Sequence, residues 1–373
     1  MPGLYVHIPF CHKACHYCNF HFSTNLKTIH RTLGAIRKEA ELQAEKFQDV
    51  SFTTLYFGGG TPSLLDLSDL SELFSVLRNL YVIYSVESTL EANPEDISSE
   101  KLEGWLEMGI DRLSIGIQTF NDAQLKIFNR NHTAAQARQC IDLAKSAGFS
   151  HFNLDLIFGF PGQTLKQWDD DLQKMLEIGP EHISVYALTR EEGTAYDQLY
   201  KKGILDEVNE SLVSDMFYLA RERLTHAGYL HYEVSNYALP GHEARHNSGY
   251  WSGDLYLGLG PSAHSYAHDK RWWNFSNNAL YEKTLFLNKK WYEEEILTNK
   301  NRFNEIIITG IRTSKGISIE KCKKFLDDEE FSDWYKKVED LVKKGIFNLK
   351  ADHLIINPEY LFISDTFALQ LLI

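Results

Sequence analysis

Three cysteines near the start of the chain have a spacing that suits one inorganic centre. Cys11, Cys15 and Cys18 occur in the run Cys-His-Lys-Ala-Cys-His-Tyr-Cys. Thiolates four and then three residues apart can all point at one centre when the loop wraps around it, and three of them leave one position open to an outside ligand. An open position is typical of ligand exchange or chemistry. The alternative from spacing alone is a Cys3His zinc site, with a fourth ligand from His12, His16 or His21.

The elements that must position this loop follow an alternating pattern. Strands are predicted over 4–10, 54–57, 86–91, 112–118, 152–158 and 183–188, with helices over 28–47, from 68 onward, and over 98–108, 122–128 and 134–147. Strands that alternate with helices indicate an α/β fold with a parallel sheet. Six β/α units are two short of a closed eightfold barrel. We therefore predict a partial barrel with a lateral gap that could admit a bulky substrate.

The alternation stops after about residue 193. A long helix over 210–227 precedes a region rich in Tyr, His and Gly, and from about residue 301 the pattern changes to helix, helix and two short strands. This last pattern is a winged-helix outline. We predict a partial β/α barrel over 1–200, an extension of it over 201–290, and a smaller α+β winged-helix-like domain over 291–373. Four consecutive acidic residues at 327–330 favour a docking or lid module over a DNA binder.

Composition excludes several classes of partner. The net charge of −13 over 373 residues, without a dense basic run, disfavours nucleic acid. No apolar run approaches the roughly 20 residues that a membrane helix needs. Five cysteines, three of them clustered, fit a reducing compartment, and Cys140 and Cys322 are interpreted as isolated small hydrophobic residues. We expect a soluble, cytoplasmic protein that is not embedded in a membrane.

Polar or small residues recur where successive predicted strands end. The set consists of the glycine turn Gly58–Gly60 with Thr61, then Glu91, Gln118, Asp155 and Ala187. The carboxyl ends of barrel strands meet on one face, so these residues are expected to line one pocket. Each has a plainer reading on its own, since a single Glu at a strand end is usually a solvated rim residue and three glycines can be merely a tight turn.

Two segments beside the cysteines carry a family resemblance. Tyr5-Val-His-Ile-Pro-Phe-Cys11 reads as a strand leading into the cysteine loop, and Tyr56-Phe-Gly-Gly-Gly-Thr-Pro62 as a strand ending in a glycine turn. With the CxxxCxxC loop they resemble the radical S-adenosylmethionine (SAM) superfamily, in its coproporphyrinogen dehydrogenase/HemW branch, over almost the whole chain. The resemblance implies a [4Fe–4S] cluster on Cys11, Cys15 and Cys18, with SAM on the fourth iron.

The resemblance also implies which residues surround SAM. By position they are Tyr5, Gly59, Gly60, Thr61, Glu91, Gln118, Arg130, Asp155 and Ala187, around two SAM sites, with Tyr17 packed inside the cysteine loop. Their chemistry suits the ligand, because carboxylates accept hydrogen bonds from an ammonium or from ribose hydroxyls and an arginine can bind a carboxylate with two donors. Glycine lets the backbone come close to a ligand without a Cβ in the way.

Two departures separate this chain from the oxidases of that branch. The oxidase pattern continues as CxxxCxxCxC, but the extra position here is Phe20. Those enzymes also carry an amino-terminal arm of several dozen residues, whereas ten residues precede Cys11. Both features point instead to the HemW subgroup, which is thought to carry heme.

A second motif agrees with that subgroup. His246-Asn-Ser-Gly-Tyr250-Trp251 matches the HNxxYW pattern associated there with heme. Histidine is a common ligand of heme iron, and the Tyr and Trp rings could stack on a macrocycle. We expect these residues in a loop loosened by glycine. The alternative is a packed aromatic core with hydrogen-bonded histidines.

We therefore expect a heme chaperone rather than an oxidase, with a [4Fe–4S] cluster, SAM and heme as cofactors. The expected partner is an acceptor hemoprotein such as a membrane respiratory enzyme. The alternative is a radical SAM enzyme that acts on a porphyrin, and a structural zinc protein is the third reading. Whether the protein is a homodimer and whether SAM is cleaved stay open at this level.

Overall fold

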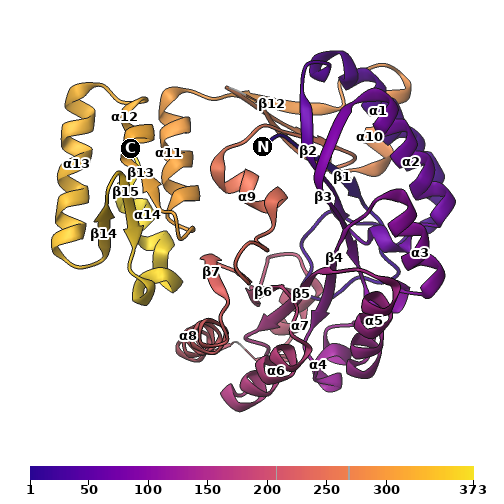
Figure 1. Cartoon of the computed structure of the whole chain (residues 1–373), viewed down its shortest axis with the longest axis horizontal. Coiled ribbons are helices and arrows are strands. Elements are labelled where there is room, and N and C mark those ends of the chain that lie inside the picture. The colour runs from indigo at the N-terminus through magenta and orange to yellow at the C-terminus, as the bar shows by residue number, and fades with distance from the viewer. Residues whose placement is uncertain (207, 268) are drawn as a thin grey trace.

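The computed structural model describes residues 1–206, 208–267 and 269–373 and is organised around one twelve-stranded sheet (Figure 1). Six neighbouring strands of this sheet are parallel and follow one another in the chain. They are β1 (Gly3–Ile8), β2 (Ser51–Gly59), β3 (Val82–Ala92), β4 (Arg112–Gln118), β5 (His151–Phe158) and β6 (His182–Ala187). Parallel order brings all six carboxyl ends to one edge, where the predicted site residues were expected.

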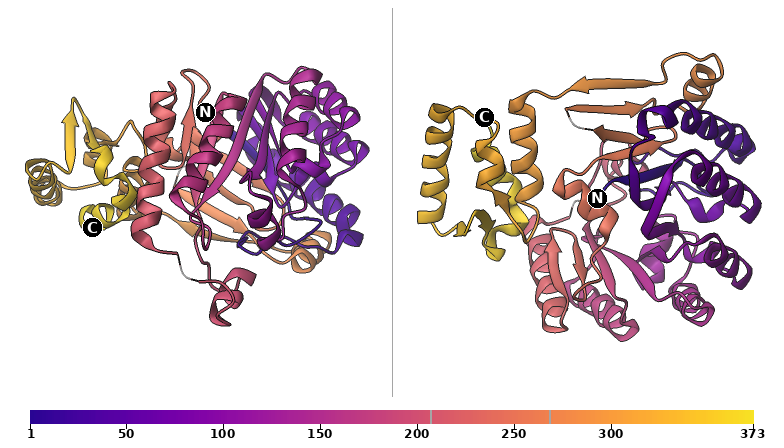
Figure 2. Two further views of the ribbon diagram at one scale, coloured as in Figure 1. Left: turned by 90° about the horizontal axis from the view of Figure 1, so that it is seen from below. Right: turned by 45° about the horizontal axis from the view of Figure 1, so that its top comes forward.

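Helices cover the outer face of these parallel strands (Figures 1 and 2). They are α1 (Ile29–Ala44), α2 (Leu67–Leu80), α3 (Ser99–Met108), α4 (Asp122–Ile127), α5 (Ala134–Ala147) and α6 (Leu165–Ile178). Local sequence sets their ends: Thr133 begins α5 with a capping box, and Gly148 ends it in the left-handed conformation that glycine adopts without strain. The prediction missed α6, although Thr164 and Gln167 form a capping box before it.

Antiparallel strands extend the sheet at both ends, in the region where the predicted alternation stopped. Beyond β6 lie β8 (Asn236–Ala238) and β7 (Leu230–Glu233), which follow α7 (Ala195–Lys201) and α8 (Glu210–His226). On the other side β9 (Tyr256–Leu259) runs parallel to β1, followed by the antiparallel strands β10 (His264–Ala267), β11 (Lys270–Asn274) and β12 (Tyr292–Ile296). Helix α10 (Asn278–Phe286) packs on α1. Among the described residues β7 and β12 do not pair with each other, so the barrel stays open.

A buried carboxylate ties α1 to this extension. Glu39 is fully buried and accepts hydrogen bonds from the Gly260 N–H, the Asn274 side-chain amide, the Tyr281 hydroxyl and the Trp291 indole. Burial raises the pKa of Glu39 to about 7, although these four donors act in the opposite direction.

Helix α9 (Arg245–Ser252) lies across the open side, against the start of the parallel strands (Figure 1). The prediction that the HNxxYW segment forms a loop is therefore wrong, because the segment is helical. Glu87 of β3 explains the helix, because its two carboxylate oxygens accept hydrogen bonds from the Arg245 and His246 N–H groups, both at 2.9 Å. This cap comes from a strand that is distant in the sequence. The motif itself contains no residue that predicts the start of this helix.

A second hydrophobic cluster organises the end of the chain, which we call the C-terminal unit (residues 299–373). It contains α11 (Asn299–Gly310), β13 (Ile317–Ser318), α12 (Ile319–Lys323), α13 (Asp328–Lys343), β14 (Phe347–Lys350), β15 (His353–Ile356) and α14 (Ser364–Leu371). The three strands form their own sheet in the order β13-β15-β14. Its helices and strands follow the winged-helix order, with a third strand and a final helix beyond those predicted.

The C-terminal unit meets the barrel beside β7. The Val234 N–H donates to the Arg312 carbonyl at 2.8 Å, and the Ser314 N–H donates to the Tyr232 carbonyl at 2.9 Å. The fold class is thus confirmed as a partial six-unit β/α barrel with a smaller carboxyl-terminal α+β part. None of the helices in the described residues is both long and apolar enough to cross a membrane.

Candidate functional site

The three motif cysteines lie together in the loop that follows β1, at the carboxyl edge of the sheet. Cys11, Cys15 and Cys18 are half-buried free thiols. The loop is fixed to the end of α4, since the Asn129 side chain donates to the Ala14 carbonyl at 2.8 Å and the His16 N–H donates to the Phe128 carbonyl at 3.2 Å. A loop that is already fixed at two points loses less conformational entropy when a cofactor binds to its three sulfur atoms.

Two neighbouring side chains donate to these sulfurs. The Thr61 hydroxyl donates to Cys11 Sγ at 3.3 Å, and Arg130 Nη1 donates to Cys15 Sγ at 3.5 Å. Arg130 is itself fixed, because its Nη2 donates to Asn93 Oδ1 at 2.8 Å and to the Gly116 carbonyl at 2.7 Å. Hydrogen bonds of this kind orient metal-bound thiolates and tune the centre that they hold.

The arrangement fits an iron–sulfur cluster better than single zinc. Burial raises the pKa of Cys11 to about 12, so its thiolate needs a strongly positive centre beside it. Within the described residues no three His, Cys, Asp or Glu side chains are close enough to share one metal ion. A cluster places each thiolate on a different iron and so needs wider spacing than a tetrahedral zinc. Cys11, Cys15 and Cys18 would hold such a cluster.

The glycine turn after β2 lies against the start of the cysteine loop. Gly59 has a φ of 108°, which favours glycine. A Cβ on Gly60 would lie 2.7 Å from both the backbone N and the carbonyl O of Phe10. The expectation that ligand approach explains this glycine is therefore incomplete. The protein's own backbone already fills the space in which a side chain would stand.

Two carboxylates face the interior above this turn. Glu91 accepts from the Tyr56 hydroxyl at 2.8 Å and from the Gly59 N–H at 3.1 Å, and burial raises its pKa to about 7. Asp155 accepts from the Asn153 side chain at 2.6 Å, and burial raises its pKa to about 6. Both groups therefore change charge near neutral pH, and both could accept from a cationic or hydroxyl-bearing ligand.

The remaining predicted mouth residues are also near strand ends. Gln118 ends β4 with a φ of 68°, at a register shift between β4 and β5, and such a strained non-glycine residue is common at functional sites. Tyr5 bonds to His7 Nδ1 at 3.0 Å on β1, and Tyr17 packs on Phe128 at 5.8 Å between ring centroids. Ala187 is exposed at the end of β6.

The heme-associated residues lie at the other end of the barrel. His246 is 4% exposed, and its ring nitrogens bond to the Thr54 hydroxyl and to the Tyr250 hydroxyl, each at 2.8 Å. Burial lowers the pKa of His246 to about 3, so the ring is neutral. The structure thus separates this motif from the cysteine loop. It also occupies both nitrogens that an iron would need.

Three side chains of the site were missed by sequence reasoning. Tyr56 and Asn153 hold the two carboxylates, and Asn93 holds Arg130. Strand alternation was the available signal for Tyr56, since it stands two residues after the inward-facing Thr54. Asn93 comes directly after β3 and before Pro94, at the same edge as Glu91.

Comparison with known proteins gives a consistent picture. The family model described as the radical SAM superfamily matches residues 5–175. The heme chaperone HemW of Lactococcus lactis is 34% identical over 85% of this chain and 83% of its own length, and that of Mycobacterium tuberculosis is 38% identical over 76% and 74%. Among solved structures, the radical SAM enzyme coproporphyrinogen III oxidase (HemN) of Escherichia coli superimposes with a TM-score of 0.86 at 23% identity. That match covers 99% of this chain and 89% of the other, and at this identity it bears on the fold alone.

Proposed function

This chain belongs to the HemW family of the radical SAM superfamily, and on that premise we propose that it is a heme chaperone, which binds heme and transfers it to an acceptor hemoprotein. The observation that carries the proposal is similarity to curated heme chaperones over most of both chains. The residue at the fourth position of the oxidase pattern agrees with it. Phe20 stands there instead of a cysteine, with 70% of its surface exposed.

The cofactors that the superfamily implies are a [4Fe–4S] cluster and SAM. A cluster held by three cysteines has one open iron, which supplies the position for the amino and carboxylate groups of SAM. We assign Cys11, Cys15 and Cys18 to the cluster, with Thr61 and Arg130 orienting two of the sulfurs. Around SAM we assign Tyr5, Gly59, Gly60, Thr61, Glu91, Gln118, Arg130, Asp155 and Ala187, with Tyr17 inside the cysteine loop and packed on Phe128.

Within that pocket the carboxylates have a positioning role. Glu91 is held between the Tyr56 hydroxyl, which donates to Oε1, and the Gly59 N–H, which donates to Oε2. Each carboxylate oxygen keeps a second lone pair that can accept a hydrogen bond from a ligand. Asp155 accepts one hydrogen bond from the Asn153 side chain, at 2.6 Å. Carboxylates fixed in this manner lose little entropy when they accept hydrogen bonds from a cationic ligand.

The partner in this proposal is a hemoprotein that receives heme, with a membrane respiratory enzyme as the class that we favour and the cytoplasm as the compartment. The C-terminal unit is the docking module that we assign to it. A homodimer is compatible with this role.

A transfer assay tests the function. The anaerobically reconstituted full chain is loaded with hemin and mixed with an apo-globin as a probe acceptor, and heme transfer is followed by the shift of the Soret band. We expect transfer that is faster than release of heme into buffer containing a scavenger. Transfer no faster than release overturns the chaperone role. Formation of 5′-deoxyadenosine together with decarboxylated coproporphyrinogen product would support the porphyrin enzyme instead.

A further inference from the structure

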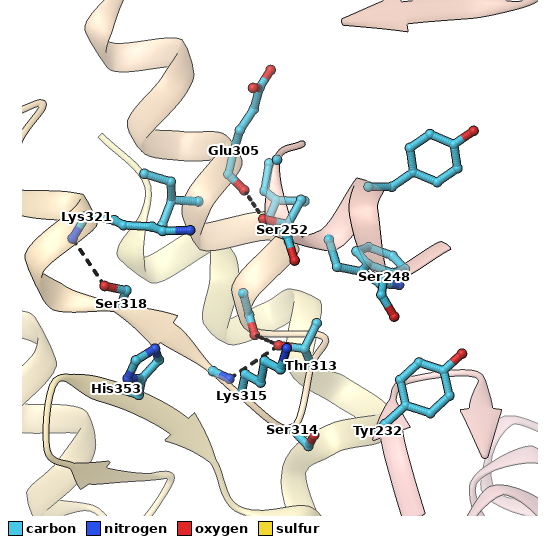
Figure 3. A pocket seen from close by; sticks show the side chains of 18 of the residues that line it. Tyr232, Ser248, Ser252, Glu305, Thr313, Ser314, Lys315, Ser318, Lys321 and His353 are labelled. Carbon is cyan, nitrogen blue, oxygen red and sulfur yellow. Dashed lines mark hydrogen bonds between the residues drawn. The ribbon is translucent and has the colours of Figure 1, made fainter. Parts of the chain in front are cut away.

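A large cavity lies between helix α9 and the C-terminal unit, away from the cysteine loop. Its volume is about 1600 Å³, and its walls come from α9, β7, β9 and β10 on one side and from α11, α12, β13 and β15 on the other. Figure 3 shows Lys315, Lys321 and His353 on the wall of the C-terminal unit, opposite Tyr232 and Ser248. The site described above uses none of these residues.

The barrel wall of the cavity is aromatic. Tyr250 and Trp251, the last two residues of the HNxxYW motif, line it, and so do Tyr232, Tyr256 and Tyr266. His246 does not line it, because its ring turns inward to Thr54. The motif therefore supplies flat rings to the cavity and uses its histidine to fasten α9. Flat rings suit a flat macrocycle.

The cavity is basic although the chain is acidic. Six Arg and Lys side chains line it against four Asp and Glu, in a protein with a net charge of −13. Three of the four acidic side chains already have a hydrogen-bond or ion-pair partner within the protein. Asp352 accepts from the Ser318 hydroxyl and the Glu320 N–H, while Glu305 pairs with Arg271.

Four of the six cations have no ion-pair partner among the described residues: Arg245 and Arg302, and, on the wall of the C-terminal unit, Lys315 and Lys321. Glu320 pairs with Lys324 at 3.1 Å, but neither Lys315 nor Lys321 has an ion-pair partner among the residues described. Both flank β13, with Lys315 just before it and Lys321 in the helix that follows. Unpaired cations on one wall favour a ligand with carboxylates.

One histidine on the same wall is available as a metal ligand. His353 lies opposite Ser318 in the β13–β15 pair, and its ring forms no hydrogen bond with any part of the chain that the structure describes. His231, the other histidine of the lining, bonds through Nε2 to the Val234 carbonyl and stacks on Tyr237 at 4.1 Å. A neutral imidazole with a free nitrogen is a good ligand for heme iron.

We propose that this cavity is the heme site, with His353 as an iron ligand, Lys315 and Lys321 paired with the propionates, and Tyr250 and Trp251 against the macrocycle. The assignment rests on the proposed function, since it names the place where the cargo lies. It gives the C-terminal unit half of the binding site.

Titration of the full chain with hemin and with iron-free protoporphyrin IX tests each part. His353→Ala should weaken hemin binding about tenfold and change the Soret band, while protoporphyrin IX binding stays unchanged because it has no iron to ligate. Added imidazole should restore the Soret band. Lys315→Glu with Lys321→Glu should weaken both ligands about tenfold.

Matched variants serve as controls. His30→Ala removes a histidine with an 81% exposed side chain, and Lys283→Glu with Lys289→Glu reverses two exposed charges outside the cavity. Neither should alter binding. If wild type binds hemin while the His353 and lysine variants match it, the cavity assignment fails and the chaperone proposal stands. If wild type binds no hemin, the proposed function fails.

Discussion

The imidazole of His246 stacks on the phenol ring of Tyr56, with the ring centroids 5.0 Å apart and the planes inclined by 24°. Tyr56 in turn donates to Glu91, and Glu91 accepts from the Gly59 N–H. One stacking contact and two hydrogen bonds thus connect helix α9 to the glycine turn. The two ends of the barrel are therefore physically joined through three side chains.

His246→Ala should lower stability as well as heme retention. The change removes two hydrogen bonds and leaves a cavity beneath α9, which together cost about 2–4 kcal/mol in the free energy of unfolding. Urea unfolding measures this loss, and hemin titration should show weaker binding because Tyr250 and Trp251 lose their support. The cluster absorption should persist. A variant as stable as His30→Ala, with wild-type heme binding, would contradict the fastening role of His246.

Cys15→Ala should abolish the cluster. Each of the three thiolates is needed on its own iron, and no other described cysteine lies in the loop. Iron and sulfide analysis after anaerobic reconstitution measures the loss, together with the visible charge-transfer absorption. Cys140→Ala is the control, because Cys140 is buried in α5 and should leave the iron content unchanged. A full cluster in Cys15→Ala would refute the ligand assignment.

Gly60→Ala should disturb cluster loading and not SAM binding alone. The added Cβ would meet backbone atoms of Phe10 at 2.7 Å, and Phe10 directly precedes Cys11. Iron content after reconstitution should therefore fall. Gly34→Ala is the control, because a Cβ there meets nothing closer than 3.9 Å and alanine favours the α1 helix. Normal iron content with weakened SAM binding would instead indicate that the turn yields and that the ligand alone needs the glycine.

SAM affinity should rise as the pH increases through about 7. Burial raises the pKa of Glu91 to about 7, so its carboxylate gains negative charge across this range and attracts the cationic ligand more strongly. Equilibrium binding measured from pH 6 to 8 should show this rise in wild type. In Glu91→Gln the contribution disappears, and affinity at pH 8 should fall about tenfold. Parallel pH profiles for the two proteins would rule Glu91 out of the SAM site.

Glu39 should make the fold less stable as the pH rises from 4.5 to 7. Its pKa lies near 7 in the native protein and near 4.5 once unfolded, so the native state binds the extra proton across this window. The contribution to the free energy of unfolding is fully present below pH 4.5 and is lost by about pH 7. Its size is on the order of 3 kcal/mol. Urea unfolding of wild type and Glu39→Gln at pH 5 and 7.5 measures this effect. The free energy of unfolding should change less between the two pH values in the variant. Equal changes in the two proteins would show that a group other than Glu39 takes up the proton.

Local sequence predicted those elements whose ends carry their own signals. Strand β4 and helix α5 have the predicted bounds, because Thr133 and Gly148 cap the helix from within its own segment. Helix α9 could not be predicted in this way, since Asn, Ser and Gly disfavour a helix and its cap, Glu87, is 158 residues away. Strand β12 is mostly acidic and depends on cross-strand pairing with Lys270 and Arg271 of β11.

For the candidate site too, the sequence indicated which residues share one edge of the sheet but not how each side chain is oriented. Residues at strand ends share one edge of any parallel sheet, so the grouping of Glu91 and Gln118 with the cysteine loop followed from their positions. The inward turn of His246 did not follow, because the side that a helix residue faces depends on what the helix packs against. Gly3 and Thr54, which receive its ring, are distant in sequence.

The position of α9 across the open side of the barrel, away from the cysteine loop, has a consequence for the two proposed binding sites. The rings of His246, Tyr56 and Tyr5 pack against one another between the two ends, with centroids 5.0–6.3 Å apart. In the proposed arrangement these packed rings would stand between a macrocycle in the cavity beside α9 and the cluster on the cysteine loop. The proposal therefore predicts that one scaffold keeps its cluster and its heme out of direct contact with each other.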